Sequence, residues 1–413
     1  MNSDVLWRFL MSQVIGKDLK DIIEYAYTNV PLYMNRIINN KIPDSIEDVP
    51  ILRKNELNND LNSCISNEYV MAMRNNKLMK VRTSGTTGIT SEVFWDNKDN
   101  NRSLLSLWLL RKRFYNILPS DKLVYFYPCD YRTDGSEVID EYSLGISKRF
   151  LIDGNIEEKY KRILEYDPVW MITQPSVALL LCDAYEKVGI KIKSLRYIEL
   201  TGEYLHKEAR ERIEKVFDCI VANQYGTKEV NSIAFECPCG KMHIMEDNVY
   251  VECEKVDENE DFGNIIVTSR INKAMPILRY FTGDVGKINN IEKCDCGLSS
   301  KELILRQGRD DDQILFPDGT RKNAYILFQV LNHINYVREG VILQYQIIQK
   351  GFMDFIVYIV VNEEYNEDIS YDIIFEFKKR LWRDVNINIY IVDDFLKAYK
   401  KEKLACFICE EEN

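Results

Sequence analysis

The sequence lacks the features that define membrane and secreted proteins. No apolar run reaches the roughly 18 residues that a membrane-spanning helix needs. The segment Met1–Gly16 carries Asp4 and Arg8 and does not follow the charged, apolar and small-residue order of a signal peptide. We therefore expect a cytoplasmic protein with no membrane partner.

Histidine is scarce, and basic residues are outnumbered. Only His206, His243 and His333 are present, which argues against a Ser-His-Asp hydrolase. Lysine and arginine number 54 against 65 aspartates and glutamates, so the formal net charge is -11 and the pI is near 5.1. Because such a surface repels phosphate backbones, we expect no nucleic-acid partner.

The overall composition is that of a globular protein. The chain has 413 residues, of which 46% are hydrophobic and 29% are charged. One hydrophobic core seldom supports a chain of this length, so we expect at least two domains. The eleven cysteines do not indicate a disulfide framework, because thiols in the cytosol stay reduced.

Short apolar runs alternate with amphipathic segments in the first three hundred residues. Helical spacing of apolar residues marks much of the first 40 residues, up to Pro31. Further on we predict, in chain order, strands and helices at Leu123–Tyr127, Val169–Ile172, Pro175–Val188 (helix), Tyr197–Leu200, Lys207–Val216 (helix) and Cys219–Ala222. This alternation predicts a largely parallel α/β sheet.

The pattern changes after Gly226. His243–Val256 and Gly263–Ser269 are typical of antiparallel strands, and the charged segment Gly308–Asp312 predicts a domain boundary. Beyond it we predict strands and a helix at Gln344–Gln349, Asp354–Val361, Ser370–Trp382 (helix) and Asn386–Val392. This βββαβ-like order suits a small α+β domain.

The segment Thr83–Gly88 packs four hydroxyl side chains and two glycines into six residues. Glycines let a backbone approach a phosphate closely, and successive amides and hydroxyls can donate hydrogen bonds to its oxygens. It is not a Walker A loop, because no Lys-Ser/Thr pair follows Gly88. A solvated turn is the alternative explanation of the same residues.

Three later segments point to the same chemistry. Asn223–Glu229 follows an expected strand and offers a tyrosine face, a glycine turn and a carboxylate for Mg²⁺. Arg279–Asp284 ends in a carboxylate after a Thr-Gly turn, which suits a ribose diol. Gly308–Ile314 follows as a charged segment. Each is weak alone, because an aspartate after a glycine is usually turn chemistry.

Together and in this order, the four segments resemble those of the adenylate-forming (acyl- and aryl-CoA ligase) superfamily. The nearest branch is the phenylacetate-CoA ligase and CapK-like group, and Ala26–Tyr33 and Thr201–Tyr204 also match it. The resemblance covers nearly the whole chain. It implies an α/β fold, with a large N-terminal domain of mixed, mostly parallel sheets with helices and a small α+β C-terminal domain.

The resemblance also implies functions for individual residues. Those that would bind ATP or AMP are Ser84, Gly85, Thr86, Thr87 and Gly88 at the β- and γ-phosphates, Gly202, Glu203 and Tyr204 along the adenine, Asn223, Tyr225, Gly226 and Thr227 around adenine and acyl adenylate, Asp284 at the ribose, and Arg309 near ribose or phosphate. The implied catalytic residues are Lys403, Glu229 as the Mg²⁺ carboxylate, Arg309 and Thr227. The implied domains are 1–310 for ATP and acid binding and 311–413 as a mobile domain that rotates about Asp311.

Some residues depart from the pattern of the branch. Ile89–Ser91 stands where a lysine usually follows the glycine-rich segment, Lys228 where many members have threonine, and Phe281 where most have arginine. The C-terminal lysine is the least secure match, because Glu402 replaces the glycine before Lys403. Lys401 competes for the same function, and an exposed lysine on a charged tail explains either residue.

The function implied is the ATP-dependent activation of a carboxylic acid as an acyl adenylate, followed by transfer to a thiol. Mg²⁺ and a lysine would neutralise the charge that builds on the phosphates. The acid pocket would be lined by Tyr125, Tyr127, Trp170, Gln174 and Pro175. These residues suit an aromatic acid, although core packing explains them equally well.

Several alternatives remain open at this point. The acceptor thiol would be that of CoA, or else that of an acyl or peptidyl carrier protein in a biosynthetic pathway. A degenerate, non-catalytic member of the family is the third reading. The partners implied are thus a small carboxylic acid and CoA or a carrier protein, and a homodimer is among the states that the sequence allows.

Cysteines and one histidine also cluster with the spacing of metal ligands. Cys237-Pro-Cys239 precedes His243, and Cys294-Asp-Cys296 follows further along the chain, each pair ending in a glycine turn. Five candidates compete for four positions of a structural Zn²⁺, within a subregion of about 235–300. The branch often keeps a cysteine and a histidine six residues apart, which favours Cys237, His243, Cys294 and Cys296, with Cys239 as substitute. Unrelated thiols are the alternative.

Overall fold

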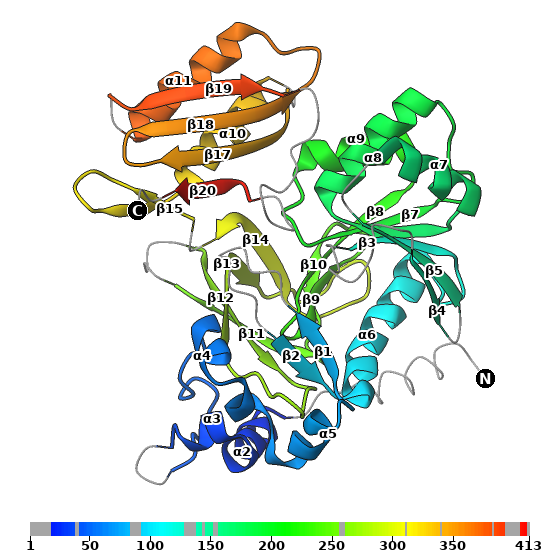
Figure 1. The fold of residues 1–413 in the computed structure, drawn as a ribbon, viewed down its shortest axis with the longest axis vertical. Helices are drawn as coiled ribbons and strands as arrows, with labels where there is room; N and C mark the ends of the chain where they lie inside the picture. Colours follow the sequence, from blue (N-terminus) through cyan, green and yellow to red (C-terminus); the bar gives the residue numbers. More distant parts are fainter. Residues whose placement is uncertain are drawn as a thin grey trace. The chain divides into compact units, whose positions relative to one another are not determined.

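The computed structural model describes eleven stretches of the chain, shown in Figure 1: residues 18–37, 41–82, 92–127, 138–142, 145–151, 156–255, 261–309, 312–338, 341–381, 384–392 and 405–410. The chain forms two compact units. The first combines Met1–Pro119 with Ala222–Arg306, and the second combines Ser120–Val221 with Gln307–Asn413. The boundary expected at residue 310 stays a prediction. Within the described ranges, no helix has both the length and the hydrophobicity of a membrane span.

The first unit begins with the helices expected near the N-terminus. α2 (Leu19–Asn29) starts where the Asp18 carboxylate accepts a hydrogen bond from the Lys20 amide at 2.9 Å, and α3 (Pro31–Met34) follows. The buried residues of α2 recur at helical spacing and pack with Tyr33. The Tyr33 hydroxyl donates to the Pro276 carbonyl at 3.1 Å, which ties this segment to the rest of the unit.

The sheet of the first unit is largely antiparallel. Its strands follow the order β11 (Val249–Glu254), β12 (Gly263–Ser269), β13 (Tyr280–Asn289), β14 (Glu302–Arg309), β10 (Met242–Ile244), β9 (Asn231–Glu236) and β8 (Ile220–Thr227). The expected antiparallel strands are therefore confirmed. The same unit also contains α4 (Lys54–Asn59), α5 (Val70–Arg74), α6 (Asn97–Tyr115), short 3₁₀ turns at Leu61–Cys64 and Asn67–Tyr69, and the hairpin β1 (Met79–Arg82) and β2 (Glu92–Trp95).

The first part of the second unit is the parallel α/β sheet that the sequence predicts. Its strand order is β7 (Tyr197–Thr201), β6 (Trp170–Thr173), β3 (Leu123–Tyr127), β5 (Gly145–Leu151) and the antiparallel β4 (Val138–Tyr142). Helices α7 (Ile156–Tyr166), α8 (Pro175–Val188) and α9 (Lys207–Phe217) share a core with one face of these strands. That core includes Val124, Met171 and Ile198, which alternate with side chains on the other face.

The last part of the second unit is a four-stranded sheet with two helices. The hairpin β15 (Gln313–Leu315) and β16 (Arg321–Asn323) leads into α10 (Tyr325–Val337), and the sheet order is β19 (Asn386–Ile391), β18 (Asp354–Val361), β17 (Ile342–Lys350) and β20 (Phe407–Glu410). α11 (Glu367–Arg380) connects β18 to β19. The strands β17, β18 and β19 and the helix α11 overlap the segments predicted from the sequence, and α10 and β20 complete this part of the unit. The apolar residues of α10 face the core, whereas Gln329 and His333 are exposed at helical spacing.

Candidate functional site

Two segments that the sequence assigns to a nucleotide site meet in the first unit. The Tyr225 hydroxyl, at the end of β8, donates a hydrogen bond to Asp284 Oδ2 on β13 at 2.8 Å. Both side chains are half-buried, and they lie 59 positions apart in the chain. The Asp284 amide donates to Thr282 Oγ1 at 3.1 Å, and Gly283 adopts a φ of +80° that suits glycine. The tyrosine face and the carboxylate therefore belong to one site.

A sharp irregularity in β8 explains the glycine after Tyr225. The pairing of β8 with β9 shifts register between Tyr225 and Gly226, and a Cβ on Gly226 would lie 2.5 Å from the Asn231 carbonyl oxygen. No side chain fits there. The next hydroxyl, Thr227 Oγ1, is buried and has no hydrogen-bond partner within the described part of the protein. A buried hydroxyl without a partner is the feature expected where a polar ligand group binds.

Glu229 follows this turn and is buried, with 5% of its surface exposed. The Tyr280 hydroxyl donates to Glu229 Oε1 at 2.8 Å. This bond uses one carboxylate oxygen as an acceptor, and the second has further lone pairs for a hard cation. The sequence did not single out Tyr280, although it lies inside the Arg279–Asp284 segment, because its partner is decided by tertiary contact.

Asn223 is held by a residue that the sequence analysis also missed. The Asn223 amide donates to Glu236 Oε2 at 2.6 Å, and the carboxylate of Glu236 is buried. Glu236 lies on β9, and its carbonyl accepts the Tyr115 hydroxyl at 2.7 Å. The backbone just before Tyr225 is therefore fixed by a charge-assisted hydrogen bond.

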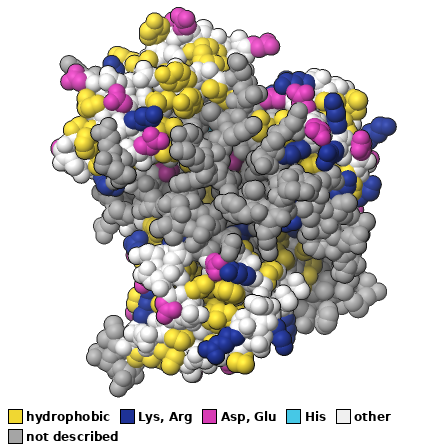
Figure 2. Space-filling view, in the orientation of Figure 1, with side chains coloured by type: hydrophobic (Ala, Val, Ile, Leu, Met, Phe, Trp, Pro, Cys, Tyr) yellow, Lys and Arg dark blue, Asp and Glu magenta, His cyan; other side chains and the backbone are white. Residues whose placement is uncertain are grey.

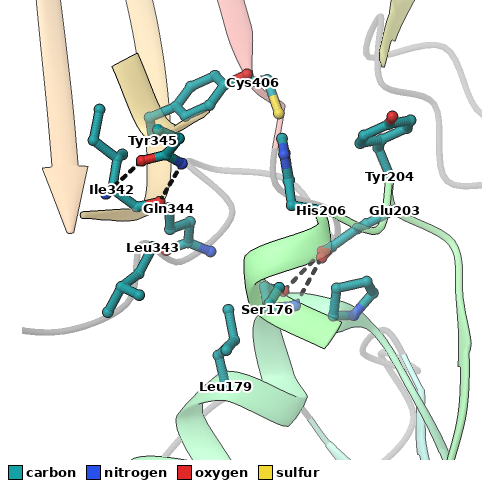
Figure 3. Close-up of a pocket in the computed structure, with 13 residues that line it drawn as sticks. Ser176, Leu179, Glu203, Tyr204, His206, Ile342, Leu343, Gln344, Tyr345 and Cys406 are labelled. Atoms are coloured by element: carbon teal, nitrogen blue, oxygen red, sulfur yellow. Dashed lines mark hydrogen bonds between the residues drawn. The ribbon is translucent and has the colours of Figure 1, made fainter. Parts of the chain in front are cut away.

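The Gly202–Tyr204 segment lies in the second unit and lines a cavity of about 50 Å³, shown in Figure 3. Glu203 accepts hydrogen bonds from the Ser176 amide at 3.0 Å and the Ser176 hydroxyl at 2.9 Å. The carboxylate thereby caps the start of α8. Gly202 adopts a φ of +87°, which lets the chain turn after β7.

The same cavity borders a buried polar cluster around Gln307. Its side-chain amide donates to the hydroxyl of Tyr345 and lies 3.3 Å from His206 Nε2 and 3.7 Å from Cys406 Sγ. Burial lowers the pKa of His206 to about 4, so the ring is neutral at pH 7. Burial also raises the pKa of Cys406 to about 12. This environment gives His206 a packing function.

Several other residues that the resemblance assigns to the site are not among those that the structure describes. These are Ser84, Gly85, Thr86, Thr87 and Gly88, the hinge residue Asp311 and Lys403 with its competitor Lys401. The side chains of Arg309 and Tyr127 are likewise outside the description. The functions inferred for these residues stay predictions.

The residues expected to line an acid pocket do not share one surface. The register of β3 against β6 pairs Leu123 with Trp170, so Tyr125 and Trp170 lie on the face opposite the core beneath α7 to α9. Trp170 is fully buried and stacks on Tyr197, with ring centroids 6.2 Å apart. Gln174 and Pro175 lie instead at the junction of β6 and α8, and Pro175 lines the cavity beside Glu203.

Four candidate metal ligands come together in the first unit. The donor atoms of Cys237, His243, Cys294 and Cys296 all lie within 4.8 Å of one another. Cys237 Sγ and Cys294 Sγ are 3.9 Å apart, and Cys296 Sγ and His243 Nε2 are 3.3 Å apart. A zinc tetrahedron with Zn–S bonds of about 2.3 Å has sulfur–sulfur edges of about 3.8 Å. The separations fit such a tetrahedron.

Two similar turns present these sulfurs. The Cys237 amide donates to the Lys241 carbonyl at 2.9 Å, and the Cys294 amide donates to the Leu298 carbonyl at 3.1 Å. Each turn closes with a glycine amide that donates back to the cysteine carbonyl, from Gly240 or Gly297. Both glycines have positive φ, at +74° and +83°. The repeated geometry explains why each Cys-x-Cys-Gly segment folds into a compact loop.

The remaining candidate, Cys239, is exposed and is not one of these four, although its thiol lies against those of Cys237 and Cys294. His243 Nδ1 lies 3.1 Å from the Ser300 carbonyl oxygen, which leaves Nε2 facing the sulfurs. Burial raises the pKa of Cys294, but hydrogen bonds from the Cys296 amide, His243 and the neighbouring thiols lower it overall to about 6. A thiolate and a neutral imidazole are the forms that bind zinc.

Comparison with known proteins gives matches over most of the chain. Residues 319–400 match the family model of the CapK C-terminal domain. Protein CapK of Staphylococcus aureus is 22% identical over 393 residues, which are 84% of this chain and 77% of that protein. A phenylacetate-coenzyme A ligase of Thermus thermophilus is 27% identical over 184 residues, which are 42% of this chain and 41% of that enzyme.

A solved structure extends the likeness to the whole chain. It is 2-hydroxyisobutyryl-CoA ligase in the postadenylation state, in complex with R3-HIB-AMP. It aligns with a TM-score of 0.70 at 14% identity and covers 99% of this chain and 90% of its own. The chain therefore shares the fold of this acyl-CoA ligase. In sequence it is similar to the phenylacetate-CoA ligases and to protein CapK. The expected fold class is therefore confirmed.

Proposed function

We propose that this protein activates a carboxylic acid with ATP as an acyl adenylate and then transfers the acyl group to the thiol of CoA. The hydrogen bond of 2.8 Å between Tyr225 and Asp284 carries the proposal, because it joins the segments assigned to adenine and ribose. The partnerless hydroxyl of Thr227 beside it adds support. The relatives named as phenylacetate-coenzyme A ligases suggest the same chemistry and an aromatic acid.

The first step needs no protein nucleophile. A carboxylate oxygen of the acid attacks the α-phosphorus of ATP, the bond to the β-phosphate oxygen breaks, and pyrophosphate leaves. The protein orients the two substrates and stabilises the charge that develops. In this proposal Asp284 accepts hydrogen bonds from the ribose, Tyr225 lies against the adenine, and Thr227 donates to the adenylate.

Glu229 would hold Mg²⁺ at this site. Its buried carboxylate fits a hard cation, because Tyr280 fixes one oxygen and the acceptor lone pairs of the other remain. The ion would neutralise charge on the phosphate oxygens. Lys403, with Lys401 as its competitor, is proposed to supply a further positive charge to the same step.

The second step transfers the acyl group to sulfur. The thiolate attacks the acyl carbon, the carbon–oxygen bond to AMP breaks, and AMP leaves as a phosphate monoester anion. A mixed anhydride is a far better electrophile than a carboxylate, which is why the first step is needed. The acid itself is proposed to be aromatic, because several relatives are named phenylacetate-coenzyme A ligases.

We further propose a structural zinc at Cys237, His243, Cys294 and Cys296. The donor set of three sulfurs and one nitrogen, within 4.8 Å of one another, is typical of a closed tetrahedral zinc site. Because all four positions are taken by protein, this ion would have no place for a substrate. Zinc would cross-link two loops that are distant in the chain.

The test is pyrophosphate exchange into ATP with a panel of aromatic and aliphatic acids. We expect exchange with at least one aryl or arylalkyl acid, and thioester formation when CoA is added. Thioester formation on a carrier protein but not on CoA would reassign the acceptor. Tight ATP binding without exchange for any acid would contradict the proposed enzyme activity.

A further inference from the structure

The edge strand β19 lacks the charges that protect other edges. Its sequence Asn-Ile-Asn-Ile-Tyr-Ile contains no charged residue, proline or glycine. The other outermost strands of the large and small sheets all contain carboxylates, namely Asp140 and Glu141 in β4, Glu252 and Glu254 in β11, and Glu410 in β20. Unpaired strand edges without charge or proline readily pair with another strand.

The backbone groups that face outward on β19 can be identified from its pairing. β19 runs parallel to β18, and the amides of Asn386 and Val392 donate to carbonyls of the segment around β18 at 2.8 and 3.0 Å. Strand alternation then turns the amides and carbonyls of the intervening odd-numbered residues to the edge on which no strand of the described residues pairs with β19: Ile387, Ile389 and Ile391. This set is symmetric about Ile389.

Helix α11, which lies beside β19 in Figure 1, leaves apolar side chains exposed. Tyr371 is 67% exposed and Phe375 is 60% exposed. Figure 2 shows hydrophobic side chains gathered over the end of the molecule that carries α11 and β19, with charged groups among them. The charges of the helix are divided, because its first turn is acidic and its last turn is basic.

One stripe of side chains along α11 has its charged residues at the two ends, with opposite signs, and its apolar residues between them. Residues at helical spacing along it are Glu367, Tyr371, Ile374 and Lys378. At 100° per residue, the stripe lies roughly 130° around the helix from the buried face and also from Asp372. Asp372 pairs with Arg338 at the end of α10, at 3.0 Å, so the stripe lies on the flank away from α10.

We propose that β19 and α11 form a two-fold interface with a second copy of this chain. Pairing β19 antiparallel about Ile389 would join the two small sheets into one of eight strands. The same axis would align the two copies of α11 antiparallel, so that Glu367 of each faces Lys378 of the partner. Tyr371 of each would pack on Ile374 of the partner. Ile389 and the centre of this stripe both lie near the middle of their elements.

The symmetry of the β19 edge and of the α11 stripe favours a second copy of this chain, rather than a different protein, as the binding partner. An isologous interface needs a surface that is complementary to itself. The outward backbone groups meet this condition around Ile389, and the stripe meets it between residues 372 and 373. A strand and a helix together also offer a larger contact than an edge strand alone, which a stable dimer requires.

The first test is sedimentation equilibrium of the whole protein at concentrations from about 1 to 100 μM. We expect a species of twice the 48.6 kDa chain mass. Replacing Ile391→Pro removes an outward amide and should weaken the dimer by at least about tenfold. The matched variant Ile391→Val keeps the amide and should dimerise normally.

The second test is a charge exchange on α11, which leaves the strand intact. Lys378→Glu and Glu367→Lys should each weaken the dimer by about tenfold, because each places like charges together twice per dimer. The double variant should restore the original dissociation constant. A chain of 48.6 kDa at all concentrations overturns the proposal. So does a dimer that none of these variants weakens.

Discussion

The first unit contains two polar sites that are built in opposite ways. At the cysteine cluster, two similar turns and strand β10 bring four candidate metal ligands within 4.8 Å, and all four lie in that unit. At the proposed nucleotide site, Tyr225 and Tyr280 donate hydrogen bonds to the carboxylates of Asp284 and Glu229. The proposed partners Ser84–Gly88 and Lys403 come from elsewhere in the chain. A structural ion is held best when protein side chains fill all of its coordination positions, whereas a substrate site must remain accessible.

The largest effect is expected from removing one of the four protein ligands of the proposed zinc site. Cys294→Ser should abolish zinc binding and reduce the free energy of unfolding by about 3–5 kcal/mol, because metal binding energy contributes directly to folding. Metal analysis and thermal unfolding measure both. Cys239→Ser is the matched control, since Cys239 adjoins the cluster and is exposed but is not one of the four proposed ligands. Equal effects of the two substitutions would refute the ligand set.

Glu229→Gln should instead reduce activity strongly and leave stability nearly unchanged. The amide can still accept the Tyr280 hydroxyl, so the melting temperature should change little, but the negative charge for Mg²⁺ is lost. Pyrophosphate exchange should fall by about 10²–10³-fold. If the melting temperature fell as strongly as in Cys294→Ser, the contrast between the two sites would disappear.

The variants Asp284→Asn and Tyr225→Phe test how these two side chains bind ATP at the proposed nucleotide site. Asp284→Asn should raise the KM for ATP by about tenfold, because a carboxylate accepts two ribose hydroxyls better than an amide does. Tyr225→Phe keeps the stacking face and removes only the 2.8 Å hydrogen bond, so a change of about threefold is expected. Initial rates at varied ATP concentrations distinguish these outcomes. A larger loss for Tyr225→Phe than for Asp284→Asn would argue against ribose binding by Asp284.

The smallest effect concerns His206, a buried polar group that binds neither proposed ligand. Its pKa is about 4 in the folded protein and near 6.5 when unfolded, so the unfolded chain takes up the proton first as pH falls. Stability from this residue is complete above pH 6.5, so it has no effect at neutral pH, and is lost toward pH 4, by roughly 3 kcal/mol at that pH. Denaturation of His206→Asn across this range should show a shallower pH dependence than the wild type. An identical slope would contradict a neutral, buried His206.

Local patterns predicted much of the fold. Leu123–Tyr127, Gly263–Ser269 and Asp354–Val361 form strands with the expected bounds, and Pro175–Val188 forms the expected helix. These segments have clear periodicity or a proline at the first helical position.

The residues of the candidate sites likewise divide into those that the sequence pointed to and those that only the structure revealed. Residue types and spacing left five candidate ligands; the resemblance to the branch favoured Cys237, His243, Cys294 and Cys296, and the fold brings the same four together. The partner of Glu229 could not be predicted, because Tyr280 reaches it from β13, 51 positions away. Pairings across that distance depend on sheet order, which local periodicity does not contain.

The sequence by itself determined the chemistry available to this protein: the thiols and imidazole with metal-ligand spacing, the glycine at 226 and the carboxylates at 229 and 284. Only the tertiary structure decided which of these groups meet. The Tyr225 hydroxyl reaches Asp284 although three strands separate β8 from β13 in the sheet order, and Cys239 is exposed and is not one of the four grouped ligands. The physical reason is that hydrogen bonds and metal bonds act over about 2–3 Å, and only the packing of distant strands sets separations on that scale.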